Sequence, residues 1–192
     1  MAFRIPDTLV RAVFEPVWDR YEGSVRLATM KKLAAAQWDE PEKIQVHQSG
    51  MLNAMARHAF ATSPFHRRRF EEAGIDPSGV RTIGDLRALP VMTKDEVRNH
   101  LDDILSTAYA RKDLVPSKTG GSTGVALNVF CDRRGIEMRA GAALLADTWS
   151  GWRLGQPLAA VWGNPPEPRT LKNRIRRGLK DRIIYLDTMR ID

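Results

Sequence analysis

The chain has little cysteine and no long apolar run. Cys131 is the single cysteine among 192 residues, so no disulfide can form within the chain and nothing requires an oxidising compartment. The first fifteen residues carry four charged side chains and lack the apolar core of a signal peptide. No window approaches the roughly 18 apolar residues of a membrane-spanning helix. We therefore expect a cytoplasmic protein without a membrane span.

Histidine is also scarce, and its placement argues against two kinds of catalytic site. The four histidines do not have the spacing of a metal site such as His-Glu-x-x-His, so we propose no metal site built by the protein. All four precede Ser122, which lies in a Gly-x-Ser-x-Gly match. In hydrolases with that elbow the catalytic histidine follows the serine, so we set the hydrolase interpretation aside.

Acidic residues are outnumbered by basic ones, and the formal net charge is +7. Much of the excess is local, because the segment from Pro168 to Arg182 holds seven basic side chains and one acidic one, a net charge of +6. One hypothesis is therefore a small basic interaction module that binds an anionic partner through residues 169–182. The segment lacks aromatic interleaving and any recognition-helix motif, which favours a solvated helix face over specific nucleic-acid binding.

Hydrophobic periodicity and capping residues predict a helical region over residues 1–110. Apolar side chains recur every three to four positions, and serine or threonine stands before several helix starts. In two places an acidic residue follows the threonine by three positions, which is the spacing of a capping box. The expected helices span 24–37 and 41–62, run from Ser63 to Gly74, and begin at Thr82 and Thr93.

After Asp113 the pattern changes to strands that alternate with helices. A short extended segment at 114–117 is followed by residues 125–131, which alternate in the two-residue period of a strand. The continuous apolar run 158–162 is typical of a buried strand in a parallel sheet, and a further strand is expected at 183–186.

A long helix is expected between these strands, capped by Asp132. Its apolar side chains lie on two sides, so we expect it to be largely buried. The predicted fold class is α/β, with a helical N-terminal region at 1–110 and a β-sheet with flanking helices from 111 to 192.

The segment Thr119-Gly120-Gly121-Ser122-Thr123-Gly124 stands between the first two predicted strands. Its three glycines and three hydroxyls can direct several backbone N–H groups and side-chain donors at one point, which is what binding a triphosphate requires. A phosphate loop of the P-loop class needs a lysine directly after its last glycine, at the start of a helix, whereas Val125 and a strand follow here. The glycine spacing also differs from that of a dinucleotide-binding turn.

This loop and its flanks resemble the adenylate-forming (AMP-binding) ligases, specifically the phenylacetate–CoA ligase family and its relatives in capsular polysaccharide biosynthesis. The resemblance covers most of Ser63 to Asp192. Beside the loop, it rests on the following segments: Phe65–Phe70, Gly74–Pro77, Leu86–Lys94, Trp149–Trp152 with Gly155, Val161–Gly163 and Tyr185–Asp187.

The resemblance implies a two-step reaction. A substrate carboxylate attacks the α-phosphate of ATP to give an acyl-adenylate and pyrophosphate, and a thiol such as that of coenzyme A then takes the acyl group. ATP with Mg²⁺ would bind at Thr119, Gly120, Gly121, Ser122, Thr123 and Gly124. Trp162 and Asn164 follow a strand end, where open α/β sheets bind ligands, and are expected to line an acid pocket.

The chain departs from this family in two respects. Val125-Ala126 stands where members often carry lysine and proline. The second adenine-site motif, the acidic residue that binds the ribose and the small C-terminal domain with its catalytic lysine are all absent. We therefore expect an N-terminal, truncated part of the large ligase domain that is inactive alone, and we assign no catalytic residue.

Overall fold

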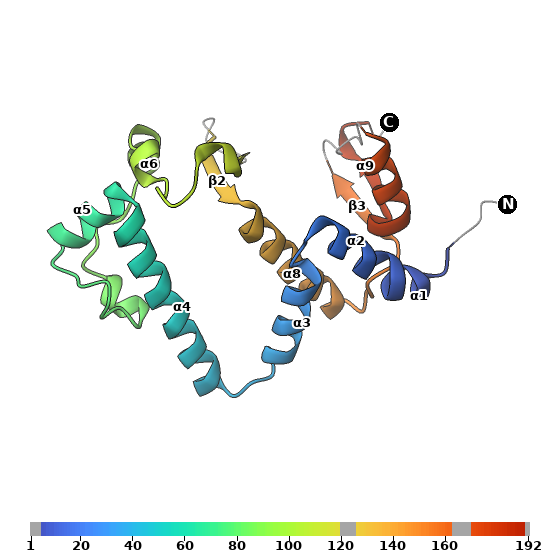
Figure 1. The fold of residues 1–192 in the computed structure, drawn as a ribbon, viewed down its shortest axis with the longest axis horizontal. Helices are drawn as coiled ribbons and strands as arrows, with labels where there is room; N and C mark the ends of the chain where they lie inside the picture. The colour runs from blue at the N-terminus through green and yellow to red at the C-terminus, as the bar shows by residue number, and fades with distance from the viewer. Residues whose placement is uncertain (1–4, 120–125, 163–169, 191–192) are drawn as a thin grey trace. The chain divides into compact units, whose positions relative to one another are not determined.

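A computed structural model of the chain describes residues 5–119, 126–162 and 170–190, with the side chains of Trp162 and Arg190 left aside. The chain divides into two compact units, one formed by residues 1–34 and 137–192 and the other by residues 35–136 (Figure 1). Helices and strands occur in both units, which confirms the α/β class, but the strands among the described residues form two separate two-stranded sheets instead of one sheet. The predicted division of the chain into a helical region at 1–110 and the start of a nucleotide-binding domain at 111–192 is not tested by these units and stays a prediction. Within the described ranges, no helix is long and apolar enough to cross a membrane.

The unit of residues 35–136 is mainly helical. Its elements are α4 (Pro41–Thr62), α5 (Pro64–Glu72), η2 (Ile83–Leu86), α6 (Lys94–Asn99), α7 (Leu101–Ile104), η3 (Arg111–Asp113), β1 (Leu114–Lys118) and β2 (Asn128–Asp132). Its core gathers Ala56, Phe70 and Val80, with Leu52 and Phe60 of α4 packed against them. This core covers the side of α4 that carries Leu52, Ala56 and Phe60, whereas Met51 and Met55 of the same helix are exposed.

Local capping chemistry sets the ends of these helices as predicted. The Ser63 hydroxyl accepts a hydrogen bond from the backbone N–H of His66 at 3.4 Å, and Pro64 occupies the first turn of α5. Capping boxes begin η2 at Thr82 and α6 at Thr93. Each box satisfies backbone donors that a helix start leaves without partners, so a few adjacent residues are enough to begin the helix.

The other unit combines helices with a strand–helix–strand segment. Its elements are α1 (Asp7–Leu9), η1 (Val10–Phe14), α2 (Glu15–Glu22), most of α3 (Arg26–Ala36), most of α8 (Arg133–Trp149), β3 (Leu158–Trp162), α9 (Leu171–Arg176), η4 (Arg177–Asp181), β4 (Ile183–Asp187) and η5 (Thr188–Arg190). Strands β3 and β4 pair in parallel, with Leu158 opposite Ile183 and Trp162 opposite Asp187, which confirms the parallel sheet expected for 158–162. The expected burial of this strand is wrong, because Ala159 and Val161 are exposed. On one face of this sheet Val161, Ile184 and Leu186 are exposed.

Helix α8 begins as predicted but is less buried than predicted. The Asp132 carboxylate accepts a hydrogen bond from the backbone N–H of Gly135 at 2.9 Å and caps the helix. Only Gly141 and Leu145 are buried along α8, whereas Met138 is 40% and Trp149 is 71% exposed. A Cβ at position 141 would lie 2.5 Å from the carbonyl oxygen of Arg26, so the backbones of α8 and α3 are in close contact at this point. Apolar side chains on two sides of a helix therefore do not determine how much of its surface packs against other elements.

Candidate functional site

The predicted nucleotide-binding segment connects the two strands of an antiparallel hairpin. Strands β1 and β2 pair from Leu114 opposite Asp132 to Lys118 opposite Asn128. The ladder therefore ends directly before Thr119, and the chain returns to it at Asn128. A strand follows the glycine-rich segment, as predicted, and α8 starts only after that strand ends.

Thr119 closes the base of the loop with both its backbone and its side chain. Its backbone N–H donates to the carbonyl oxygen of Leu127 at 3.0 Å, and the N–H of Leu127 donates to the Thr119 Oγ1 atom at 3.0 Å. This reciprocal pair extends the hairpin by one step and fixes the distance between the two ends of residues 120–126. Fixing both ends of a connecting segment lowers the conformational entropy that binding a ligand costs.

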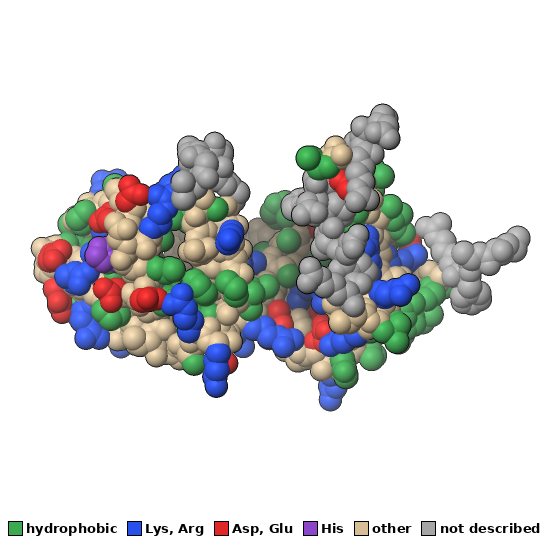
Figure 2. Space-filling view, turned by 90° about the horizontal axis from the view of Figure 1, so that it is seen from above, with side chains coloured by type: hydrophobic (Ala, Val, Ile, Leu, Met, Phe, Trp, Pro, Cys, Tyr) green, Lys and Arg blue, Asp and Glu red, His purple; other side chains and the backbone are tan. Residues whose placement is uncertain are grey.

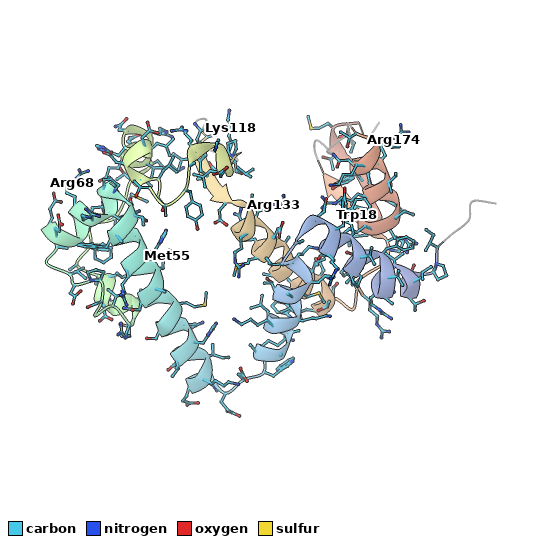
Figure 3. All side chains as sticks on the ribbon, in the orientation of Figure 1. Trp18, Met55, Arg68, Lys118, Arg133 and Arg174 are labelled. Carbon is cyan, nitrogen blue, oxygen red and sulfur yellow. The ribbon has the colours of Figure 1, made fainter. Side chains whose placement is uncertain are left out.

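Basic side chains lie at the hairpin. Lys118, the last residue of β1, is exposed and has no side-chain partner among the described residues (Figure 3). The Arg111 guanidinium lies 4.9 Å from the centre of the Phe130 ring and forms an ion pair with Asp102. Positive charge at the loop base favours a polyanionic ligand, and the exposed position of Lys118 leaves its ammonium free to reach one.

The structure places some of the predicted site residues. Thr119 is described and exposed, whereas Gly120, Gly121, Ser122, Thr123 and Gly124 lie outside the described residues, as does Asn164. The backbone of Trp162 ends β3, where it pairs with Asp187. Thr119 belongs to the unit of residues 35–136 and Trp162 to the other unit, and their assembly into one site stays a prediction.

We expect the Thr119→Val substitution to loosen the loop base selectively. It removes the acceptor of the Leu127 N–H and retains the shape of the side chain, so the hairpin end should lose about 1 kcal/mol. Hydrogen exchange of the Leu127 amide should then be about fivefold faster. The matched Thr119→Ser variant keeps the hydroxyl and should exchange like the wild type. Equal exchange in all three proteins would show that the side-chain hydrogen bond contributes nothing.

The basic segment 169–182 is paired with acidic side chains of α2. Lys172 Nζ lies 3.0 Å from Glu22 Oε1, and Lys180 Nζ lies 2.9 Å from Asp19 Oδ1. Arg176 contacts Glu22 at 3.9 Å and Asp181 at 3.2 Å. On the face that Figure 2 shows, acidic and basic side chains are interspersed. These pairs reduce the charge available to an external partner, while Arg174 stays exposed.

Part of this pairing is buried. Glu15, Asp19 and Lys180 are each less than 5% exposed, and Arg26 of α3 forms ion pairs with both Glu15 and Asp19. Burial raises the pKa of Glu15, although the charge of Arg26 acts in the opposite direction. Burial also acts to raise the pKa of Glu22, but the hydrogen bond from Lys172 and the charge of Arg176 lower it overall.

The spacing of these charges is a signal that sequence reasoning missed. Acidic residues at 15, 19 and 22 form one stripe of a helix, and basic residues at 172, 176 and 180 form another. Because Glu22 meets Lys172 and Asp19 meets Lys180, the two stripes run antiparallel. Such complementary stripes in distant segments could have indicated that the basic helix packs on α2.

The chain is similar to phenylacetate-coenzyme A ligases. It is 26% identical over 122 residues to the enzyme of that name from Thermus thermophilus, a match that covers 64% of this chain and 27% of the relative. It is 31% identical over 74 residues to the Escherichia coli protein of the same name, covering 38% and 17%, respectively. A third phenylacetate-coenzyme A ligase, from Aromatoleum evansii, is 22% identical over 134 residues, covering 70% of this chain and 30% of the relative.

The matches are therefore partial. They span less than a third of the length of each of these relatives. No family model matches the chain. The similarity supports a relationship to the ligase family and agrees with the resemblance found in the loop and its flanks.

Proposed function

We propose that this chain contributes the ATP phosphate-binding hairpin of an AMP-forming acid–thiol ligase. The observation that carries the proposal is the closed base of the loop, where Thr119 and Leu127 join two antiparallel strands around a segment of glycines and hydroxyls. The similarity to three proteins named phenylacetate-coenzyme A ligase supports it independently of that geometry. The chemistry would be activation of a carboxylate as an acyl-adenylate, followed by transfer to a thiol such as coenzyme A.

The residues in the loop would act on the phosphates. Backbone N–H groups at Gly120, Gly121 and Gly124 would approach the triphosphate closely because these residues have no Cβ atom. The hydroxyls of Thr119, Ser122 and Thr123 would donate hydrogen bonds to the phosphate oxygens. One well-placed donor of this kind lowers a barrier by about 3 kcal/mol, because charge on the phosphates grows during the first step. Mg²⁺ would enter with the nucleotide.

The exposed apolar face of the β3–β4 sheet supports a place within a larger ligase domain. Parallel sheets are normally covered on both faces, whereas Val161, Ile184 and Leu186 are exposed here. Within the family, the segments Trp149–Trp152 and Tyr185–Asp187 favour a member of the capsular polysaccharide type, and this subtype stays a prediction. Trp162 and Asn164 are proposed to line the acid pocket of the complete site.

The proposal predicts that ATP protects the loop from proteolysis. Trypsin cleaves after lysine, and Lys118 precedes the loop directly, so MgATP should slow cleavage at this bond in the wild-type chain. Two variants should weaken this protection. Gly121→Val blocks backbone approach and Ser122→Ala removes a donor, so each should raise the ATP concentration needed for half-maximal protection at least tenfold.

The matched control is Ser117→Ala, which removes a hydroxyl from β1 of the same hairpin without touching the loop. Its protection by MgATP should equal that of the wild type. The proposal fails if MgATP gives no protection to the wild-type chain, or if the two loop variants are protected at the same concentration as the control.

A further inference from the structure

A cavity of about 730 Å³ lies within the unit of residues 1–34 and 137–192. Its walls come from η1, the start of α2, α3, the last turn of α8 and the turn that follows α8. This volume falls within the usual range for sites that bind small organic molecules. The cavity belongs to a different compact unit from the β1–β2 hairpin, so nothing in its argument depends on the proposed ATP site.

The charged side chains that line this cavity all have one sign. Arg11, Lys31 and Arg153 come from three separate elements, and none of the lining residues is acidic. None of these three side chains forms an ion pair or hydrogen bond with a described residue. Elsewhere in the same unit, Arg26, Lys180 and Arg182 are all paired with carboxylates.

The three basic side chains are exposed and line one concave surface, so they repel one another and concentrate anions from solution. Water solvates these exposed cations, but no carboxylate of the described residues pairs with them, so an external anion would reduce their mutual repulsion. Guanidinium groups suit the oxygens of a carboxylate or a phosphate, to which they can donate two parallel hydrogen bonds.

The remaining walls are largely apolar. Leu27 and Met30 lie three positions apart on α3, so they share one side of that helix, and Trp152 adds an aromatic ring. The Trp152 Nε1–H donates to the carbonyl oxygen of Gln156 at 3.2 Å, which satisfies the polar atom of the indole. The wall therefore offers apolar surface to a ligand without leaving the indole N–H in need of a partner.

We propose that this cavity binds an organic anion with an aliphatic or aromatic body. The charged head, a carboxylate or a phosphate, lies against Arg11, Lys31 and Arg153, and the body lies on Leu27, Met30 and Trp152. A purely inorganic anion would leave the apolar walls exposed to water. A neutral apolar molecule would bring no negative charge to the three cations.

The test compares three ligands with the same chain length and different heads: decanoate and decyl phosphate, each below its micellar concentration, and decanol below its solubility limit. Binding is followed by the NMR resonance of the Trp152 indole N–H, assigned through the Trp152→Phe variant. We expect at least one of the two anions to shift this resonance and to bind at least tenfold more tightly than decanol. The tighter of the two anions identifies the head as carboxylate or phosphate.

Two triple variants separate local recognition from general charge. Arg11→Gln, Lys31→Gln and Arg153→Gln combined should weaken binding of the tighter anion at least tenfold. The control combines Arg20→Gln, Lys32→Gln and Arg174→Gln, which removes the same charge from exposed positions outside the cavity and should leave affinity within twofold. If the first combination disturbs the amide spectrum of the unit, the three single variants are measured instead, and each should weaken binding by about threefold.

The proposal is overturned if decanol binds as tightly as both anions, if the two triple variants weaken binding equally, or if the anions shift other resonances without that of Trp152. Its failure would leave the ATP-protection experiment unaffected, because that experiment reads cleavage after Lys118 in the other unit.

Discussion

Arg26→Met should destabilise the unit of residues 1–34 and 137–192 by about 3 to 5 kcal/mol. Arg26 is the cation between Glu15 and Asp19, whose side chains are 3% and 6% exposed. Asp19 keeps Lys180 as a partner, but the buried Glu15 loses its ion pair, and breaking a buried ion pair by removing one partner costs this much in proteins generally. Methionine retains most of the apolar stem, so the loss reports charge more than volume. The change in the free energy of unfolding is measured by urea unfolding, with hydrogen exchange of the α2 and α3 amides as the readout.

The pH dependence of this variant separates charge from packing. Burial already raises the pKa of Glu15, so its carboxylate contributes most to stability when protonated, at low pH, and this contribution is lost as the pH rises through the raised pKa. Without Arg26 the pKa should rise further. The deficit of Arg26→Met relative to the wild type should therefore shrink as the pH falls from 7 toward about 4.5.

Arg20→Met is the matched control, because Arg20 lies on the neighbouring α2 and is exposed. Its free energy of unfolding should stay within about 0.5 kcal/mol of the wild type at every pH. A deficit of similar size in both variants, or a deficit in Arg26→Met that does not change with pH, would contradict the assignment of the ionic cluster as the cause.

Gly155→Ala should cost about 3 kcal/mol. Gly155 has a φ of +91°, a conformation that side-chain-bearing residues rarely adopt, and a Cβ there would lie 2.5 Å from the carbonyl oxygen of Asp7 and 3.0 Å from the backbone nitrogen of Arg11. Backbone strain and steric overlap therefore add. The Gly155 carbonyl also accepts a hydrogen bond from Arg182 at 2.6 Å, and Arg182 forms an ion pair with Asp7 at 2.7 Å, so a shift at Gly155 would disturb both contacts.

Gly151 provides the control for strain alone. It has a φ of +88°, but a Cβ there would meet nothing within 4 Å. Gly151→Ala should consequently cost about 1 kcal/mol, and the difference between the two variants in urea unfolding measures the overlap at Gly155. Equal costs would mean that the chain near Asp7 moves away freely.

The helix starts in this chain could be predicted because they depend on a few adjacent residues. Ser63 with Pro64, Thr93 with Glu96, and Asp132 each act within one turn, and each cap lies where the sequence indicated. The two strands of the parallel β3–β4 sheet were also predictable from their short apolar runs, whereas their pairing with each other and the exposure of Ala159 and Val161 were not.

Long-range contacts were not predictable in the same way. The closure of the loop base pairs Thr119 with Leu127, and the choice of Leu127 follows from the register of β1 on β2. The expected burial of α8 was wrong because apolar side chains on two sides of a helix do not reveal which side finds a partner. From the sequence alone, the cations at 172, 176 and 180 were interpreted as a solvated helix face, because their acidic partners on α2 lie about 150 residues away.

The sequence by itself determined where helices begin, where the chain alternates as strands, and that a glycine- and hydroxyl-rich segment joins two of those strands. These features follow from backbone sterics and hydrogen bonds between near neighbours. Only the tertiary structure decided which charges are buried and paired, and that Arg11, Lys31 and Arg153 share one cavity. Electrostatic and packing energies depend on distances between residues far apart in the chain, and the fold alone fixes those distances.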